Sequence, residues 1–217
     1  MGAAYPVSTP QESDEFDGLT MSPQWQWHAD ADSKWAYFAG PGKGYVRLYS
    51  YPVPGDHKNL FDVGNLLLQK TPADEFTVTT KLRFVPSPAY TGGRTGLIVM
   101  GLDYAMLVVE NTPDGLMFSQ VECSKADKGS PEKNNASVPV AGGDIWLRVV
   151  FNKGAVCNFS YSTDGRRFTA LGDSFQAREG KWIGAKVGLF CTRPAEIRND
   201  GGYAEVDWFR ITKNQKR

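Results

Sequence analysis

The sequence predicts an all-β domain made of two packed antiparallel sheets. Short segments rich in β-branched and aromatic residues recur along the chain, and Gly, Pro, Asn or Asp separates them. No window carries a convincing apolar stripe at helical spacing. The length of 217 residues fits one such domain, because single β sandwiches often run past about 200 residues.

The expected strands follow one another through most of the chain. The nearest approach to a helical stripe, NLFDVGNLLLQ at 59–69, is interrupted by Gly64, so its second half is better explained as a buried strand. The full set is GYVRLYSY (44–51), NLLLQK (65–70), FTVTTKLRFV (76–85), TGLIVMGL (95–102), AMLVVEN (105–111), LMFSQVEC (116–123), IWLRVVFN (145–152), CNFSYST (157–163), AKVGLFC (185–191) and YAEVDWFRIT (203–212).

Turn-forming sequences stand where neighbouring strands would reverse. TPDG at 112–115 and STDG at 162–165 each place Asp-Gly between two apolar runs, which favours tight hairpins and therefore antiparallel pairing. The charged run SKADKGSPEKNNAS (124–137) is interpreted as a mobile surface loop. Many short strands with few helices indicate a jelly roll or concanavalin-like sandwich.

The two ends of the chain differ from this pattern. Residues 1–13 are polar, contain proline and lack periodicity, so we expect a linker or the tail of a preceding domain there. The sandwich is expected over 14–212, with a short tail at 213–217. The opening residues lack a basic segment followed by an apolar stretch, and no window is apolar for long enough to span a bilayer. We therefore expect neither a signal peptide nor a membrane span in this sequence.

Charge and cysteine content narrow the class of partner. Lys plus Arg number 24 and Asp plus Glu number 24, so the formal net charge is zero. Such a balance argues against nucleic acid and against an anionic membrane surface as partners. Cys123, Cys157 and Cys191 are too few for a disulfide framework and lack the short spacing of a zinc site, so we interpret them as core thiols.

An aromatic cluster near the start of the chain is the first candidate for a binding site. QWQWHADADSKW (24–35) holds Trp25, Trp27 and Trp35, with His28, Asp30 and Asp32 among them. The apolar face of a sugar ring can lie on an indole while nearby polar groups bind its hydroxyls. Trp25 and Trp27 also fit a second interpretation, since residues two apart share one strand face and can fill the core. The aromatic candidates for carbohydrate binding are Trp25, Trp27, Trp35, Tyr37 and Tyr45.

The acidic residues offer a weak case for catalysis and a separate hypothesis for metal binding. EVDWFR (205–210) resembles the strand of sandwich-fold glucanases that carries three carboxylates on one face, but Arg210 stands at the third position. We therefore expect no catalysis from this chain alone, with a glycanase kept as a minor alternative. Asp14, Asp17 and Asp207 would suit a structural calcium ion if the terminal strands are neighbours, and solvated turn acids are the alternative. No cofactor is expected.

Several motifs in order carry a resemblance to a known family. They are SPQWQW (22–27), NLLLQK (65–70), RTGLIVMGLDYAML (94–107), FSYSTDGRRFTALGDSFQA (159–177), WIGAKVGLF (182–190) and GGYAEVDWFRI (201–211). Over about residues 14–212 the chain resembles the C-terminal concanavalin-like domain of family 43 glycoside hydrolases. In that family the domain follows a five-bladed catalytic propeller in β-xylosidases and α-arabinofuranosidases, and it is also classed as a xylan-binding module.

The resemblance implies an accessory domain without the catalytic propeller. Its expected partners are a polysaccharide, xylan or arabinoxylan, and a glycoside hydrolase catalytic domain, within an enzyme that is secreted or periplasmic. The loop CTRPAEIRNDGGY (191–203) occupies the place of a family loop that helps close the propeller's pocket, which adds Arg193 and Arg198 to the carbohydrate-binding candidates. This loop is longer and more polar than the resemblance leads us to expect. A purely structural domain that braces the propeller is the main alternative.

Overall fold

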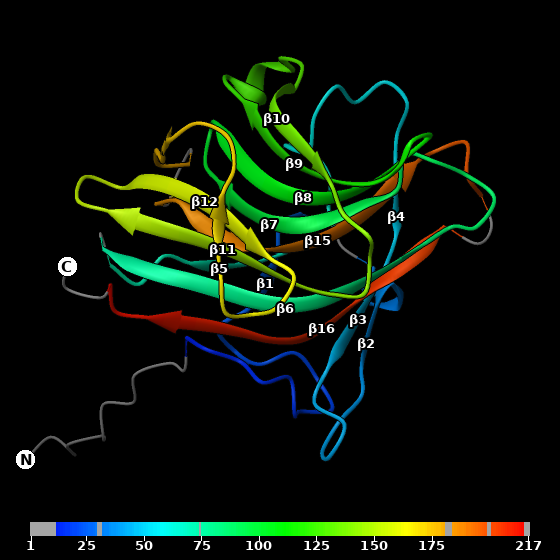
Figure 1. Ribbon diagram of the computed structural model, residues 1–217, viewed down its shortest axis with the longest axis horizontal. Helices are drawn as coiled ribbons and strands as arrows, with labels where there is room; N and C mark the ends of the chain where they lie inside the picture. Colours follow the sequence, from blue (N-terminus) through cyan, green and yellow to red (C-terminus); the bar gives the residue numbers. More distant parts are fainter. Residues whose placement is uncertain (1–11, 30–31, 74, 181–183, 199–200, 215–217) are drawn as a thin grey trace, which may run out of the picture.

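The structure is a computed structural model that describes residues 12–29, 32–73, 75–180, 184–198 and 201–214. Two eight-stranded sheets pack face to face, with strands running roughly side by side in two layers (Figure 1). Only two short 3-10 turns interrupt the strands in these residues, η1 (Ser33–Trp35) and η2 (Ala126–Lys128). The predicted all-β sandwich is confirmed. No helix in the part of the chain that the structure describes is long and apolar enough to cross a membrane.

We call the first layer sheet I. Its pairs are antiparallel except that β4 runs parallel to β15. In spatial order it contains β1 (Gln26–Trp27), β5 (Leu66–Lys70), β15 (Lys186–Pro194), β7 (Arg94–Met100), β8 (Tyr104–Thr112), β9 (Gly115–Cys123) and β10 (Lys133–Pro139), with β4 (Tyr51–Val53) beside β15.

Sheet II is antiparallel in every pair that the structure describes. A register shift between Val206 and Trp208 bends its longest contact, that of β16 with β6. In spatial order it contains β13 (Thr169–Ala170), β12 (Val156–Ser162), β11 (Asp144–Asn152), β6 (Phe76–Pro86), β16 (Gly202–Thr212), β3 (Val46–Tyr49) and β2 (Ala36–Phe38), with β14 (Phe175–Gln176) beside β12.

The main core lies between the sheets. In sheet II alternate side chains point inward, as Val78 on β6 and its partner Val149 on β11 do. Phe76 and Phe151 stack within this core with ring centroids 4.1 Å apart. Strands of sheet I are apolar on both faces, so their sequence runs continuously hydrophobic and does not alternate.

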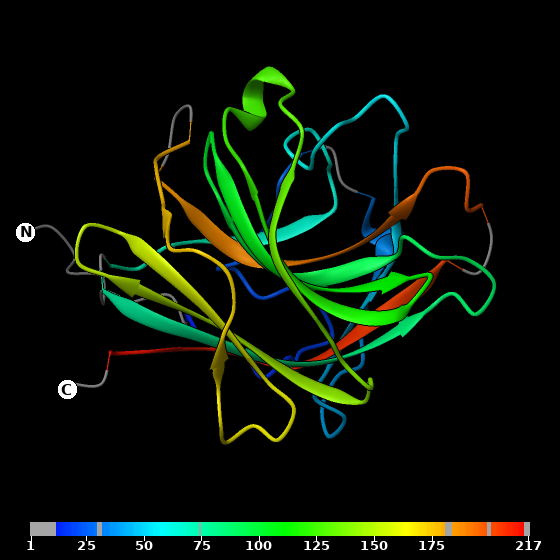
Figure 2. The ribbon, with the colours of Figure 1, turned by 45° about the horizontal axis from the view of Figure 1, so that its top comes forward.

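A second, smaller core explains the continuous hydrophobic runs. It lies on the outer face of sheet I and includes Leu66, Ile98 and Phe190, all fully buried. Two segments cover it: residues 54–65, which we call the cover loop, and residues 124–132, which include η2. Both stand on the same side of the molecule in Figure 2.

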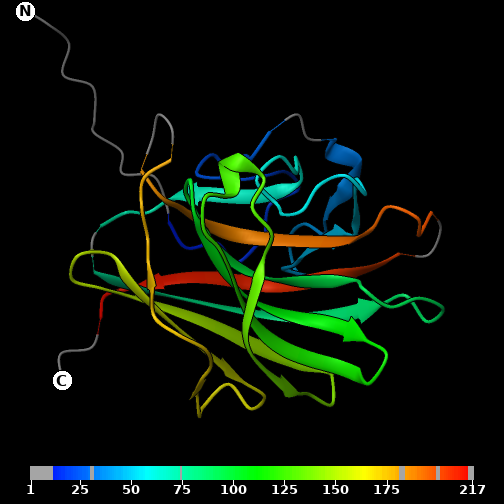
Figure 3. The ribbon, with the colours of Figure 1, turned by 90° about the horizontal axis from the view of Figure 1, so that it is seen from above.

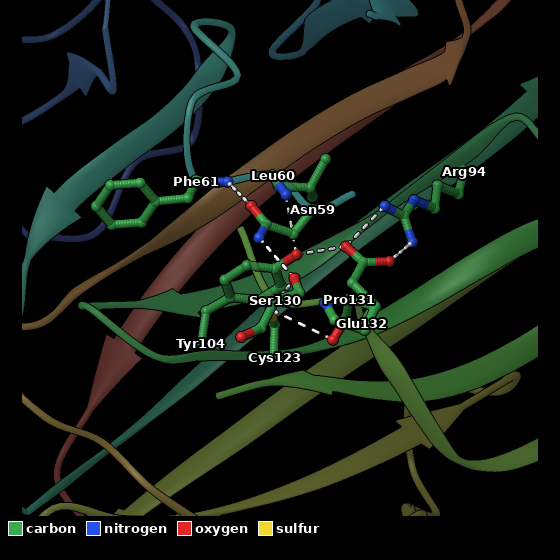
Figure 4. A network of polar contacts seen from close by, with 9 residues as sticks. All are labelled: Asn59, Leu60, Phe61, Arg94, Tyr104, Cys123, Ser130, Pro131 and Glu132. Carbon is green, nitrogen blue, oxygen red and sulfur yellow. Dashed lines mark hydrogen bonds and ion pairs between the residues drawn. The ribbon is translucent and has the colours of Figure 1, made fainter. Parts of the chain in front are cut away.

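A polar network holds these two segments in place (Figure 4). Arg94 binds Glu132 through two hydrogen bonds of 2.6 and 2.9 Å. The buried Tyr104 hydroxyl donates to Glu132 and accepts from the backbone N–H of Leu60. The side chain of Asn59 donates to the backbone carbonyls of Ala126 and Ser130 at 3.0 and 2.8 Å, which ties the cover loop to the η2 segment.

The expected strands are confirmed with two differences, the first of which concerns the charged run. Residues 124–137 were expected to form a mobile loop, but the η2 turn and the first part of strand β10 occupy most of them. That prediction was wrong because β10 is an edge strand with little buried surface, so its sequence lacks apolar alternation. The TPDG turn joins β8 to β9 as predicted.

A second difference concerns the first expected strand, 44–51. The chain does not remain in one sheet there: β3 pairs with β16 in sheet II, and β4 pairs with β15 in sheet I. Ser50 lies at the crossing and is 1% exposed. This crossing forms a corner of the sandwich, and the candidate site lies against it.

Candidate functional site

A groove of about 630 Å³ opens at the corner where the chain crosses between sheets. We call it the corner groove. Figure 3 shows the end of β15 near the start of β16, on the side of the molecule that holds η1. The groove is lined by Asp32, Lys34, Trp35, Tyr49, Ser50, Arg193, Arg198, Gly201, Gly202 and Tyr203.

Hydrogen bonds from Ser50 fix the floor of this groove. Its backbone N–H donates to the carbonyl of Gly202 at 3.1 Å, and its hydroxyl donates to the carbonyl of Gly201 at 2.8 Å. Gly202 has a φ of 80°, a conformation that residues with a side chain rarely adopt. The start of β16 is therefore held directly against the crossing strand.

Aromatic rings form two walls of the groove. Tyr49 and Tyr203 are paired across β3 and β16, and their ring centroids lie 6.4 Å apart. Trp35 is the last residue of η1, and its ring packs edge to face on that of Tyr51 with the ring centroids 5.4 Å apart. Ring faces combined with neighbouring hydrogen-bonding groups suit a sugar, which has an apolar face and a polar edge.

Arg193 lies across the end of the groove. Its Nε donates to the carbonyl of Ile197 at 2.6 Å, and its guanidinium lies 5.3 Å from the ring of Trp35. A Cβ at Gly201 would come within 2.2 Å of the Arg193 side chain, so only glycine leaves room for it. Burial lowers the pKa of Arg193 from its ordinary value.

Tyr37 and Tyr45 lie outside the groove but close to it. Their rings form a pair with centroids 6.5 Å apart. Arg47 links this pair to the groove, since its guanidinium lies 6.0 Å from the ring of Tyr45 and 4.4 Å from that of Tyr203. Hydrogen bonds from Arg47 to Glu205 raise the pKa of the arginine.

The structure separates the tryptophans that the sequence placed together. Trp25 is 3% exposed, and its Nε1 donates to Asp14 at 2.8 Å, so its ring is not available to a ligand. Trp27 is half-buried against the main core. Of the three, Trp35 alone lines the corner groove. Trp25 therefore fits the second interpretation considered for the pair, that of a core residue, whereas Trp27 packs against the core with part of its side chain exposed.

The polar residues of that cluster also separate. The Nε2 atom of His28 lies 2.7 Å from the carbonyl of Phe61 in the cover loop, and burial lowers its pKa. Asp32 lines the groove and forms an ion pair with Lys34 at 3.4 Å. Asp30 lies outside the described residues. Arg198 is exposed and also lines the groove.

The three carboxylates considered for calcium are not gathered into one site. Asp14 accepts from the backbone of Phe16 and from Trp25, whereas Asp207 pairs with Lys81. Asp17 lies beside Gly44. The described part of the chain contains no group of three or more His, Cys, Asp or Glu side chains that could hold a metal ion. The hypothesis of a calcium site at these residues therefore has no support in their geometry.

The acidic pair of β16 is likewise engaged with basic side chains. Glu205 accepts hydrogen bonds from Arg47, and Asp207 forms an ion pair with Lys81. Arg210, at the position of the third carboxylate of sandwich glucanases, binds Glu15 through two hydrogen bonds. Glu205 and Asp207 are therefore both occupied by basic side chains, whereas glycoside hydrolysis needs two carboxyl groups that can reach the substrate.

Sequence reasoning missed Tyr49, Ser50 and Tyr203. Both tyrosines belong to strands that were predicted, but their meeting depends on the register between β3 and β16. The Gly201-Gly202 pair was a usable signal, because consecutive glycines before a strand often mark a close approach of two chain segments.

Comparisons with known proteins agree with this fold. A family model described as the beta-xylosidase C-terminal concanavalin A-like domain matches residues 13–212. A curated beta-xylosidase from Formosa agariphila is 26% identical over 225 residues, which cover 94% of this chain and 36% of that protein. The chain thus spans about a third of the length of this relative.

Solved structures of other proteins have a similar fold over nearly the whole chain. A GH43 protein from Bacillus licheniformis superposes with a TM-score of 0.78 at 23% identity, over 96% of this chain and 41% of that one. A xylan beta-1,4-xylosidase from Bacillus halodurans superposes with a TM-score of 0.76 at 18% identity, over 97% of this chain and 41% of that one. At such low identity these two likenesses concern the fold alone.

Proposed function

We propose a function from one premise: the chain belongs to the family of C-terminal concanavalin A-like domains of beta-xylosidases. It serves as a non-catalytic accessory domain of a xylan-degrading glycoside hydrolase and holds a xylan or arabinoxylan chain in the corner groove. The catalytic groups come from another domain, since the chain matches only 36% of the related beta-xylosidase.

The observation that carries the proposal is the composition of the corner groove. Trp35, Tyr49 and Tyr203 offer apolar ring surfaces, and Ser50, Asp32 and the two arginines surround them with hydrogen-bonding groups. A neutral pyranose chain has the complementary pattern of C–H faces and hydroxyl edges. The activities for which similar proteins are named, those of a beta-xylosidase and a xylan beta-1,4-xylosidase, support xylan as the class of polysaccharide.

A pull-down of the full chain on insoluble xylan tests this function, with cellulose and starch as controls. We expect retention on xylan without release of reducing sugar. Trp35→Ala should lose retention while its circular dichroism spectrum stays unchanged. Trp208→Ala is the matched control, because Trp208 lies on sheet II outside the residues that line the groove. Release of sugar by the purified chain would favour the glycanase alternative.

A second candidate is a structural role. The related beta-xylosidase is much longer than this chain, so the domain has a neighbour in that protein against which it can pack. If that role is the whole function, the chain binds a separately produced catalytic domain and is not retained on any xylan. The two roles are compatible, because one domain can supply both substrate affinity and a wall of a neighbouring active site.

The proposed substrate also predicts where in the cell the parent enzyme works. Xylan is too large to cross a membrane, so an enzyme that holds the polymer has to work in the periplasm or outside the cell. Detection of the parent enzyme in those fractions would support this placement, and confinement to the cytoplasm would contradict it.

A further inference from the structure

The corner groove carries more positive charge than a neutral sugar chain requires. Three basic side chains line it, those of Lys34, Arg193 and Arg198, against one described carboxylate, that of Asp32. Asp32 is already paired with Lys34. The two arginines therefore give the groove a positive charge that this carboxylate does not offset, and such a charge would attract an anionic group.

Of the two arginines, Arg193 gives the stronger evidence for an anionic ligand. It is 8% exposed, and since it lines the groove, its exposed part faces that space. Its Nε binds the Ile197 carbonyl, and Nη1 lies 3.5 Å from the hydroxyl of Ser50, at the limit of a hydrogen bond. Within the described residues no carboxylate forms an ion pair with Arg193. A buried charge without a counter-ion is costly, so a position that retains one indicates a ligand of opposite charge.

Other arginines of the two sheets show the usual arrangement. Arg47, Arg83 and Arg94 are each bound to a carboxylate, those of Glu205, Asp144 and Glu132. Arg148 also has no such partner in the described residues and lies against a ring, with its guanidinium 3.4 Å from the centroid of Phe168. It differs from Arg193 because it is only half-buried and does not line the corner groove.

We infer that the corner groove recognises a carboxylate-bearing sugar, a uronic acid attached to the xylan chain. This inference rests on the proposed function and adds the chemistry of the ligand. Because Nε of Arg193 is bound to the Ile197 carbonyl, its two terminal nitrogens are the atoms that would donate parallel hydrogen bonds to a carboxylate. The exposed Arg198 adds a second positive charge. Trp35, Tyr49 and Tyr203 then contact the apolar faces of the adjoining sugars.

Two ligands that differ only at one carboxyl group test the inference. One is a xylo-oligosaccharide with a single glucuronic acid, and the other is the same molecule after reduction of its carboxyl group. Isothermal titration of the full chain should show the charged ligand bound at least about tenfold more tightly, as expected for a charge-assisted hydrogen bond. High salt should reduce this advantage. Equal affinity overturns the inference and leaves the proposed function intact, whereas binding of neither ligand overturns both.

Substitutions then locate the carboxylate. Arg193→Met keeps an apolar stem beside Trp35 but removes the charge, so the charged and the reduced ligand should bind this variant about equally. Arg83→Met removes a more exposed arginine of sheet II outside the groove and should keep the preference. If Arg193→Met does not fold, Arg198→Gln at an exposed position serves in its place. A preference that survives substitution of both groove arginines contradicts the assignment.

One further variant tests whether the chain supplies its own anion. Asp200 follows the groove residue Arg198 closely in sequence and lies outside the described residues. We expect Asp200→Asn to leave the preference for the charged ligand unchanged. If the natural chain shows no preference and Asp200→Asn gains one, Asp200 occupies Arg193 and the inference is wrong.

Discussion

Arg94 and Arg193 are both largely buried, yet their surroundings differ. Arg94 binds Glu132 through two hydrogen bonds and has 17% of its side chain exposed. Arg193 is bound by a backbone carbonyl and approached by one hydroxyl. The first arrangement is complete without a ligand and holds the cover of sheet I. The second leaves guanidinium donors facing a groove. A buried arginine therefore indicates function only when its counter-ion is missing from the fold.

The largest expected effect concerns the paired arginine. Glu132→Gln removes the charge that compensates Arg94, so we expect a loss of about 3–5 kcal/mol in the free energy of unfolding, measured by urea denaturation. Glu15→Gln is the matched control, because Glu15 also binds an arginine through two hydrogen bonds but is 45% exposed. That change should cost no more than about 1 kcal/mol. Equal losses in the two variants would remove the contrast between buried and exposed pairs.

Trp25 and Trp35 give the same kind of comparison for aromatic side chains, since one is in the core and the other lines the groove. Trp25→Ala empties a core position and removes the donor to Asp14, so we expect a loss of about 3–5 kcal/mol. Trp35→Ala should cost about 1 kcal/mol or less while it abolishes retention on xylan. Chemical denaturation and pull-down of both variants would check this. A Trp35 variant as unstable as the Trp25 variant would make Trp35 a structural residue.

A smaller effect tests whether the position of the Arg193 side chain matters. Gly201→Ala places a methyl group where the Arg193 side chain lies, so the arginine has to move. We expect a loss of about 1–3 kcal/mol in stability, as for other overpacked sites, together with weaker binding of the uronic acid ligand. Gly55→Ala is the control, since no atom lies within 4 Å of its added Cβ. Unchanged ligand affinity in Gly201→Ala would show that the position of Arg193 does not matter.

The smallest expected effect is a pH dependence of the stability, which comes from His28 beside the cover loop. Burial lowers the pKa of His28, whose ordinary value is 6.5; the charge of Lys186 also lowers it, and that of Asp62 raises it. The unfolded chain therefore binds the proton more readily, and stability should fall as pH decreases below about 6.5. Urea midpoints at pH 7.5 and 5.5 would measure this. His28→Gln should flatten the change; a fall that survives in His28→Gln would assign it to other groups.

Sequence reasoning recovered the fold where burial leaves a pattern. Strands such as β6 and β11 alternate because one face meets the core, and β7 and β8 are continuously apolar because both faces are covered. Strand β10 was missed because its exposed edge imposes no such pattern. The crossing at Ser50 was missed because this one residue separates β3 from β4 and no Gly, Asn or Asp marks the place where the hydrogen-bonding partners change.

The candidate site was recovered only in part. Trp35, Arg193 and Arg198 were named from the sequence and lie together in the groove. Trp25 was named with them but is buried, since spacing along the chain does not tell which side of a sheet a tryptophan faces. Tyr49 and Tyr203 come from strands far apart in sequence, and only the register of sheet II brings them together.

The most direct test of the account is a nuclear magnetic resonance titration of the ¹⁵N-labelled chain with xylohexaose. We predict that the indole signal of Trp35 and the amide signals of Ser50, Gly201 and Gly202 shift with one common affinity, while the indole signal of Trp25 does not. Shifts confined to other residues, or no shifts at all, would contradict the assignment of the corner groove as the carbohydrate site.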